Sequence, residues 1–283
     1  MTAPAQAPLV IGLALTGMVP RRADSPHVPL TPGEIAADAA RGSAAGARVF
    51  HVHAREANEE PSPRAEVFAD IVGRVKAAVP EAIVCVTTSG RTHNTFEARR
   101  AALTLEGGLK PELASLTLGS MNFPKQPSVN SPQMIEQLAG EMQGRGIIPE
   151  LEVFDTGMLD YARVLIGRGV LRPPFVFNLI LGSLGTLAAT PLNLALLVER
   201  LPQGAFWSTA GIGRFQFPMN ALGVLTGGHV RTGLEDNLYM DAGKTDPATN
   251  ERLVARIANL ARAAERPLAT FAEARAAMGL TPP

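Results

Sequence analysis

The sequence predicts a single (β/α)8 barrel, because strand-like and helix-like segments alternate along almost its whole length. Eight short apolar runs, rich in β-branched residues, recur at regular intervals, and a stretch with helical spacing follows each of them. Strands that are apolar on both faces are typical of a buried parallel sheet. The runs cover residues 9–17, 47–54, 82–89, 113–120, 147–155, 175–182, 205–211 and 229–236.

The first helical stretch has the clearest boundaries. Thr31 is a typical N-cap, and Glu34 three residues later completes a capping box. Pro32 suits the first turn, and Gly46 ends the stretch. The other stretches cover roughly residues 64–79, 94–104, 131–145, 157–168, 190–200, 215–226 and 250–265. We expect a further helix near residues 269–278, packed outside the barrel or against a neighbouring subunit.

A doubly wound open sheet is the main alternative fold, since it is also built from strand–helix units. It would favour a glycine-rich nucleotide fingerprint after the first strand, and the segment TGMVPRRADSPHVPLTP contains none. The 283 residues suit one barrel, because such barrels commonly have about 250 residues. No linker or low-complexity tract divides the sequence, so we expect one catalytic domain over residues 1–283.

The balanced charge argues against binding to nucleic acid or to an anionic membrane. The 26 Lys and Arg residues equal the 26 Asp and Glu residues, so no basic field attracts polyanions. No apolar stretch reaches the roughly 18 residues of a membrane span. The first ten residues lack the features of a secretion signal, and Cys85 is the single cysteine. We therefore expect a cytoplasmic protein that acts on a small molecule.

The second predicted strand ends in His51-Val52-His53. Side chains alternate along a strand, so both imidazoles leave the same face and can bind one ion, such as zinc or another divalent metal. The alternative is a pair of histidines packed in the core. Two inward imidazoles would repel each other when charged and would need partners when neutral, so the pattern favours a metal site.

The last predicted strand offers a third ligand. His229, Arg231, Gly233 and Glu235 alternate along it, and Asp236 follows at once. Glu235 would complete a His2Glu site with one open position, which is typical of catalytic zinc. Arg231 would present a planar fork to a carboxylate, and Asp236 would act as an ion-paired base. A purely structural Arg231–Asp236 salt bridge is the alternative.

Further polar residues are expected at the same end of the barrel. Glu150 and Glu152 lie two apart in an otherwise apolar strand, where a buried carboxylate needs a partner or a function. Candidate substrate-binding hydroxyls are Thr87, Thr88, Ser89, Ser115 and Thr117. Helix N-capping explains any one of these hydroxyls equally well.

Three residues after the seventh strand could contact a nucleotide-like cofactor. Gly211, Gly213 and Arg214 follow a strand end where barrels often bind phosphate through backbone N–H groups. A tight turn explains the glycines equally well. Cys85 has no second thiol and no evident activating base, so we interpret it as a core residue. Surface, capping or core positions are expected for His27, His93 and His229.

Taken in order, several motifs resemble the β-keto acid cleavage enzyme family, best known for 3-keto-5-aminohexanoate cleavage. They are LTPGEIAADAARGSAAGARVFHVHAR, PELASLTLGSMNF, IIPELEVFDTGML, AGIGRFQ and TGGHVRTGLEDNLY. The resemblance implies a tetramer of barrels. It implies that zinc is bound by His51, His53 and Glu235. It also implies that the catalytic pair is Arg231 and Asp236, with further active-site positions at Thr87, Ser115 and Glu152.

The resemblance also implies the reaction, a retro-Claisen-type exchange. A β-keto acid and acetyl-CoA would give acetoacetate and a new acyl-CoA. One position departs from the aminohexanoate enzyme, which places a carboxylate after the first strand to receive the substrate ammonium, whereas this sequence has Val19. We expect a substrate without that cation, because a charge beside Val19 and Met18 would lose hydration without gaining a partner.

Other functions remain open. Metal-dependent hydrolases of the amidohydrolase type also use an HxH strand in a barrel, but they need further histidine ligands on later strands. Barrel lyases that bind magnesium or manganese place their HxH late in the sequence, and here it is early. A ligand-binding barrel without catalysis would keep its ligand affinity after metal removal.

Overall fold

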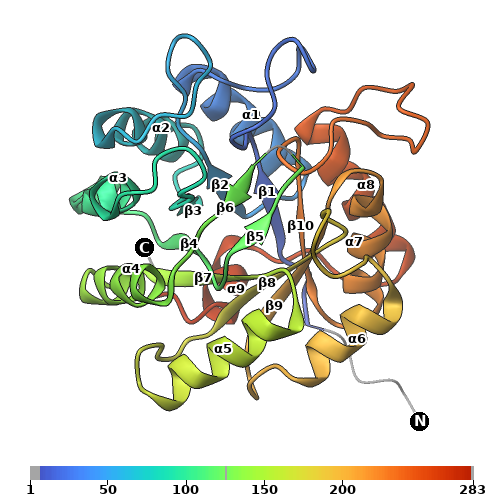
Figure 1. The fold of residues 1–283 in the computed structure, drawn as a ribbon. Helices are drawn as coiled ribbons and strands as arrows, with labels where there is room; N and C mark the ends of the chain where they lie inside the picture. Colours follow the sequence, from blue (N-terminus) through green and yellow to red (C-terminus); the bar gives the residue numbers. More distant parts are fainter. Residues whose placement is uncertain (1–6, 125, 282–283) are drawn as a thin grey trace.

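The computed structural model describes residues 7–124 and 126–281. Residues 1–6, on which the expectation about a secretion signal partly rests, lie outside this part, as do residues 282–283 at the end of the expected domain. Eight parallel strands form a closed barrel with helices around it, which confirms the predicted fold (Figure 1). In order around the barrel the strands are β1 (Ile11–Ala14), β2 (Val49–Val52), β3 (Ile83–Val86), β4 (Leu113–Thr117), β7 (Ile148–Val153), β8 (Val176–Leu181), β9 (Phe206–Gly211) and β10 (His229–Thr232).

The helices follow the strands as the sequence predicts. They are α1 (Pro32–Ala45), α2 (Ala65–Ala78), α3 (Phe96–Arg100), α4 (Pro132–Gly144), α5 (Thr156–Gly167), α6 (Pro191–Glu199), α7 (Gln216–Leu225), α8 (Asn250–Ala263) and α9 (Phe271–Ala277). The third is shorter than predicted, because the chain continues as a 3-10 helix at Ala101–Thr104. The capping box of α1 is confirmed, since Thr31 and Glu34 each accept the other's backbone N–H. No helix in the described part of the chain is long and apolar enough to cross a bilayer.

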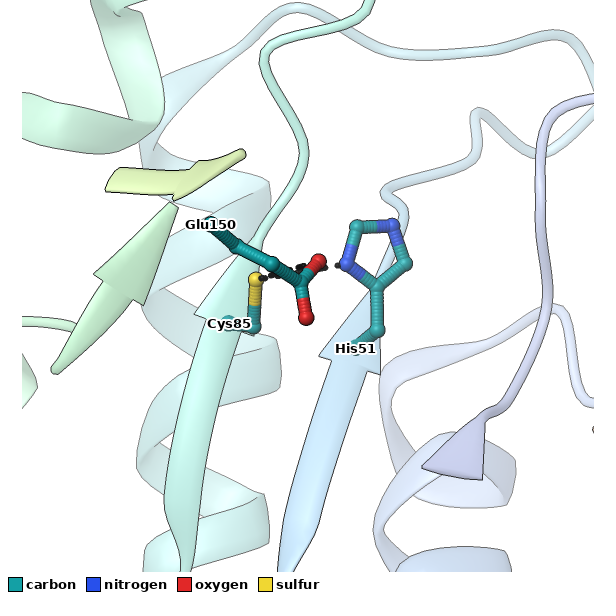
Figure 2. Close-up of side chains that lie close together, drawn as sticks. All are labelled: His51, Cys85 and Glu150. Atoms are coloured by element: carbon teal, nitrogen blue, oxygen red, sulfur yellow. Dashed lines mark hydrogen bonds between the residues drawn. The ribbon is translucent and has the colours of Figure 1, made fainter. Parts of the chain in front are cut away.

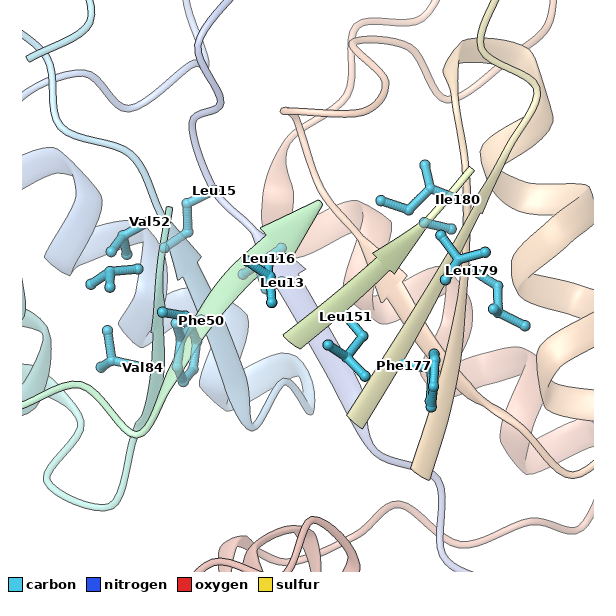
Figure 3. Close-up of a cluster of buried hydrophobic side chains, with 14 of the residues drawn as sticks. Leu13, Leu15, Phe50, Val52, Val84, Leu116, Leu151, Phe177, Leu179 and Ile180 are labelled. Carbon is cyan, nitrogen blue, oxygen red and sulfur yellow. The ribbon is translucent and has the colours of Figure 1, made fainter. Parts of the chain in front are cut away.

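The main core lies between the strands and the surrounding helices. Outward-facing strand residues such as Leu13, Phe50 and Phe177 are fully buried there (Figure 3). A second apolar cluster fills the lower barrel interior, with Val49, Ile83 and inward residues of other strands. The barrel therefore has an apolar floor beneath its upper interior.

The C-terminal helix covers the bottom of the barrel. Ala274 in α9 and Met278 just after it belong to the same cluster as the inward residues Val10 and Phe206. The sequence predicted this helix outside the barrel or against a neighbouring subunit, and it lies outside the strands, at the lower end of the barrel. The helix goes to the bottom because its small and flexible apolar side chains fill the open lower end of the barrel.

A short hairpin absent from the sequence prediction follows β4. Its strands are β5 (Met121–Asn122) and β6 (Pro127–Ser128). Phe123 in the turn lies 6.1 Å, centroid to centroid, from Phe154, which follows β7. The Arg91 guanidinium, after β3, lies 3.6 Å from the Phe123 ring centroid. The hairpin is thereby attached to loops at the C-terminal ends of the strands, where barrel active sites are found.

His229 is a core residue, one of the three placements expected for it. Its Nδ1 accepts the Val10 N–H at 3.0 Å, and its ring stacks on Phe206 with 4.2 Å between centroids. Burial lowers the pKa of His229 to about 3, and the charge of Arg266 acts in the same direction. The ring is therefore neutral in the folded protein over the physiological range.

This buried histidine predicts a loss of stability in acid. The unfolded chain takes up a proton at His229 near pH 6.5, whereas the folded chain does so only near pH 3. The free energy of unfolding should therefore fall as the pH drops below 6.5, by about 2 kcal/mol at pH 5 from this group. Urea unfolding between pH 7.5 and 5 should show a flatter pH dependence for His229→Asn. The exposed His27→Asn should keep the wild-type slope. Equal slopes for all three proteins would contradict this assignment.

Candidate metal centre and active site

Above its apolar floor, the inside of the barrel is polar. Alternation along the strands points every second side chain inward, and strand register brings His51 beside Cys85 and Ser115 beside Glu150. All of these side chains are buried. Charge inside a barrel costs free energy unless it is paired, so this polar layer needs partners within the layer or a ligand.

The predicted ligands His51, His53 and Glu235 converge at the top of this layer. The two histidine Nε2 atoms are 3.1 Å apart, and His53 Nε2 lies 3.3 Å from Glu235 Oε1. His51 Nε2 lies 3.7 Å from Glu235 Oε2. Gly17 in the loop after β1 lets Glu235 reach this place, since a Cβ there would lie 2.6 Å from Glu235 Cγ. The three residues can therefore offer one ligand atom each to a single ion.

These residues fit a divalent cation. Glu235 Oε2 is buried and has no hydrogen-bond partner among the described residues, which is costly for a carboxylate oxygen unless a cation completes its surroundings. Burial also holds the pKa of His51 well below its ordinary value, although the charge of Glu235 opposes the shift. His51 is therefore neutral, which is the form of imidazole that binds metals. Two nitrogens and one oxygen form a donor set typical of zinc.

Arg231 contacts three carboxylates of the site. Its Nε donates to Asp236 Oδ2 at 3.0 Å, and its Nη2 donates to Asp236 Oδ1 at 3.2 Å. The same Nη2 lies 2.9 Å from Glu235 Oε1, and Nη1 lies 3.4 Å from Glu152 Oε1. One buried guanidinium thus faces three carboxylates. The excess of negative charge is a second reason why a divalent cation fits here.

Asp236 has the properties of a general base. Burial raises the pKa of Asp236 to about 6, even though the neighbouring Arg231 opposes the shift. A carboxylate with a raised pKa accepts a proton more readily than an ordinary one. The structure therefore brings Arg231, Asp236 and Glu152 together, and their catalytic roles stay predictions.

The predicted hydroxyl residues divide into two groups. Thr117 donates to Glu152 Oε2 at 2.6 Å and so belongs to the charged cluster. Ser115, by contrast, accepts the backbone N–H of Thr88 at 3.3 Å and is nearly fully buried. The structure thus places Ser115 among strand-to-strand contacts, below Thr117. Its substrate-binding role stays a prediction, and Thr117 is the better placed of the two.

A small pocket opens beside His53 at the mouth of the barrel. Thr87, Met18, Ser89 and His93 are among the residues that line it. Val19, the chain neighbour of Met18, is 51% exposed and is not one of the described residues that line the pocket. The structure therefore brings Thr87 to the pocket beside His53, and the substrate-binding roles of Thr87 and Val19 stay predictions.

The residues proposed for cofactor binding form a tight turn. Gly213 has φ 60° and donates its N–H to the Asp236 carbonyl at 2.7 Å. A Cβ at Gly211 would lie 2.2 Å from the Phe215 carbonyl oxygen. Arg214 is exposed and stacks over Phe215. The turn supports the backbone of Asp236, and contact with coenzyme A stays a prediction.

Sequence reasoning missed a buried cluster beside His51. Cys85 Sγ lies 3.4 Å from His51 Nδ1 and 3.7 Å from Glu150 Oε2 (Figure 2). Cys85 is a core residue as expected, but it is not isolated from basic groups as we had inferred. Burial raises the pKa of Cys85 well above its ordinary value and that of Glu150 to about 7. The cross-strand neighbour of His51 depends on register, so no local sequence signal could have revealed this contact.

Arg55, two residues after His53, was also missed. It is buried, and its guanidinium donates to the carbonyl oxygens of Gly17, Pro20 and Glu59. The bonds to Gly17 and Pro20 attach the loop after β1, which carries Met18 and Val19, to the segment that follows the HxH motif. The sequence did offer a signal for this residue, because Arg55 is the last residue of the motif HVHAR, which is one of those that carry the family resemblance.

Comparisons with known proteins agree with this geometry. The family model described as beta-keto acid cleavage enzyme matches residues 8–280. The 3-keto-5-aminohexanoate cleavage enzyme of Acetoanaerobium sticklandii is 38% identical, covering 96% of this chain and 98% of its own. The 3-oxoadipate:acetyl-CoA acetyltransferase of Cupriavidus necator is 36% identical, covering 96% and 95%. Among solved structures, apo ObcA superposes with a TM-score of 0.81 at 23% identity, over 90% of this chain and 66% of that longer one, which supports the fold alone.

The geometry predicts which residues retain the metal. Purified wild type should contain zinc in a one-to-one ratio by elemental analysis, and both His51→Ala and Glu235→Ala should lose most of it, because each removes one of three ligands. His93→Ala is the matched control, since it lines the neighbouring pocket outside the triad. Undiminished zinc in both ligand variants would remove the proposed site.

Proposed function

The chain belongs to the beta-keto acid cleavage enzyme family, and from that premise we propose that it is a zinc-dependent enzyme that condenses a β-keto acid with acetyl-CoA to give acetoacetate and a new acyl-CoA. One observation carries the proposal. The triad of the buried His51 and His53 and the partly buried Glu235 adjoins a carboxylate, Asp236, that Arg231 holds by both oxygens. A metal site next to an oriented base is what proton abstraction beside a carbonyl requires.

The proposed metal and the proposed base have different tasks in the reaction. When bound to His51, His53 and Glu235, zinc supplies Lewis acidity toward the keto and carboxylate oxygens of the substrate. Asp236 takes a proton from the carbon between these two groups. Arg231 orients Asp236 and offsets the negative charge of the neighbouring carboxylates, while Glu152 accepts from Nη1 of the guanidinium and from the Thr117 hydroxyl.

The remaining steps need no nucleophile from the protein. The substrate carbanion attacks the carbonyl carbon of acetyl-CoA, and the C–S bond breaks to release the CoA thiolate. The thiolate then attacks the original keto carbon, and the C–C bond between that carbon and the deprotonated carbon breaks. Acetoacetate leaves after reprotonation, and the remaining acyl group is now a thioester of CoA. The buried, protonated Cys85 is consistent with this scheme, because the scheme assigns it no bond to substrate.

Hydrolase and lyase activities of the HxH barrel type are less well supported. The candidate metal-binding groups in the described part of the chain contain no third histidine. His229 lies at the opposite end of the barrel and His93 at the rim. The proposed tetramer and cytoplasmic location rest on the sequence resemblance and composition alone, and both stay predictions.

We further propose that the substrate lacks a 5-amino cation. Because Val19 is exposed, an ammonium group beside it would lose its hydration only in part, whereas the same group beside Met18, which lines the pocket, would lose more of it. The stronger reason is chemical, because neither side chain can pair with an ammonium group. Selectivity would then come from a missing partner and not from a steric clash.

Substrate selectivity can be tested directly. With acetyl-CoA as co-substrate and acetoacetate formation as readout, we expect uncharged β-keto acids to turn over faster than 3-keto-5-aminohexanoate. Val19→Glu should shift the preference toward the amine, since it supplies a carboxylate at the rim. Val164→Glu, at a 52% exposed position on α5, is the control and should leave the preference unchanged. Efficient use of the amine by wild type would refute the inference.

The role of Asp236 has its own test. Asp236→Asn keeps the shape but removes the base, so kcat should fall by about 10²–10⁴-fold, while bound zinc stays close to wild type because Asp236 is not a ligand. Asp70→Asn on the surface of α2 should change neither quantity. If Asp236→Asn retained wild-type kcat, another group would have to be the base.

A further inference from the structure

The two ring nitrogens of His51 have different surroundings. Nε2 faces the other proposed ligands, 3.1 Å from His53 Nε2 and 3.7 Å from Glu235 Oε2. Nδ1 faces the opposite way, toward Cys85 Sγ at 3.4 Å. The proposed metal therefore meets Nε2, and the Nδ1 side of the ring depends on what Cys85 can do.

Cys85 connects His51 to a third buried group. Its Sγ lies 3.7 Å from Glu150 Oε2, within the reach of a sulfur hydrogen bond (Figure 2). The exposed fractions are 4% for His51, 0% for Cys85 and 8% for Glu150. Adjacent strands fix the first contact, since His51 of β2 and Cys85 of β3 are partners in register. The three side chains thus form a compact buried cluster, in which hydrogen bonds can run in line from His51 through Cys85 to Glu150.

The direction of hydrogen bonding along this line follows from elementary chemistry. A neutral imidazole has one lone pair and one N–H, so a ring that binds metal through Nε2 carries its hydrogen on Nδ1. A buried N–H needs an acceptor, and in the described part of the chain Cys85 Sγ is the contact that His51 Nδ1 makes. The thiol can accept this hydrogen and donate its own to the Glu150 carboxylate.

We propose that Cys85 and Glu150 are positioning residues for the metal. Cys85 accepts the Nδ1 hydrogen of His51 and keeps the Nε2 lone pair pointed at the ion, and Glu150 fixes the rotation of the thiol. Histidine ligands are commonly held in this way by a carboxylate, and outer partners of this kind tune metal affinity. Here a thiol stands between the ring and the carboxylate. The inference rests on the metal site proposed above.

The same three residues could be interpreted as a second metal site, because their ligand atoms lie within 4.8 Å of one another. The lone-pair count argues against it. A neutral His51 has one lone pair, and the upper site uses it through Nε2. A second ion at Nδ1 would require the ring to lose its remaining hydrogen. A hydrogen-bonded line needs no such change.

Zinc affinity tests the proposal. Apo protein would be titrated with zinc in competition with a chromophoric chelator. Cys85→Ala should weaken binding by about 10–100-fold, whereas Cys85→Ser, which can still accept and donate, should retain most of the affinity. Ile83→Val is the matched control, since it trims an inward residue of the same strand that does not contact His51, and it should bind as wild type. Glu150→Leu should weaken binding more than Glu150→Gln, which keeps an acceptor oxygen.

A spectroscopic measurement separates the proposal from its competitor. In cobalt-substituted wild type we expect no near-ultraviolet charge-transfer band from a cobalt–thiolate bond. Such a band would show that Cys85 is a metal ligand, and it would overturn the positioning role. Equal zinc affinity of wild type and Cys85→Ala would overturn this inference alone. Failure of wild type to bind zinc would overturn the proposed metal site together with it.

Discussion

The Arg231 guanidinium keeps three carboxylates together inside the barrel, and the rest of the site depends on it. Asp236 is held by both oxygens, while Glu235 lies against Nη2 and Glu152 against Nη1 of the same guanidinium. Removing one partner from a buried ionic cluster typically costs about 3–5 kcal/mol, because a charge is left without compensation. The cluster is also incomplete by itself, since one positive charge cannot balance three negative ones. A divalent cation at the histidines would complete the balance, so the proposed metal site and the proposed base belong to one electrostatic unit.

A polar interior of this kind requires compensation elsewhere in the fold. The outer faces of the strands are packed with buried Leu, Val and Phe against the helices, and the lower interior is apolar down to Met278 after α9. The apolar floor separates the charged layer from water at the bottom of the barrel. Access to the charged layer is consequently from the top, where Met18 and Thr87 line the pocket beside His53.

The sequence could predict those parts of the fold and the site that depend on residues close together in the chain, and not those that depend on contacts between distant strands. The closed barrel, the helix boundaries and the His51–His53 pair follow from alternation and capping, which are local. The pairing of Arg231 with Asp236 was accessible for the same reason, as the two lie five positions apart. Contacts between strands were not accessible in this way. Ser115 and Thr117 face the same way along β4, and only their depth in the barrel decides which of the two contacts Glu152. That depth is set by strand register, as is the meeting of His51 with Cys85. The placement of α9 depends on the open end of a barrel whose strands are distant in sequence.

The division between strands and loops explains how such a site can keep its chemistry while its substrate changes. His51, Glu152 and Arg231 lie on strands whose backbone is fixed by neighbours on both sides, and a metal and a base need that precision. Met18, Val19 and His93 lie on loops that tolerate substitution. Arg55 links the two parts, because it lies two residues after His53 and donates to two carbonyl oxygens of the loop after β1, those of Gly17 and Pro20. The position of the loop after β1 is thus tied to the same segment that carries two of the proposed metal ligands, His51 and His53. A change of side chain at the rim can therefore alter what the pocket accepts without moving the atoms that perform the reaction.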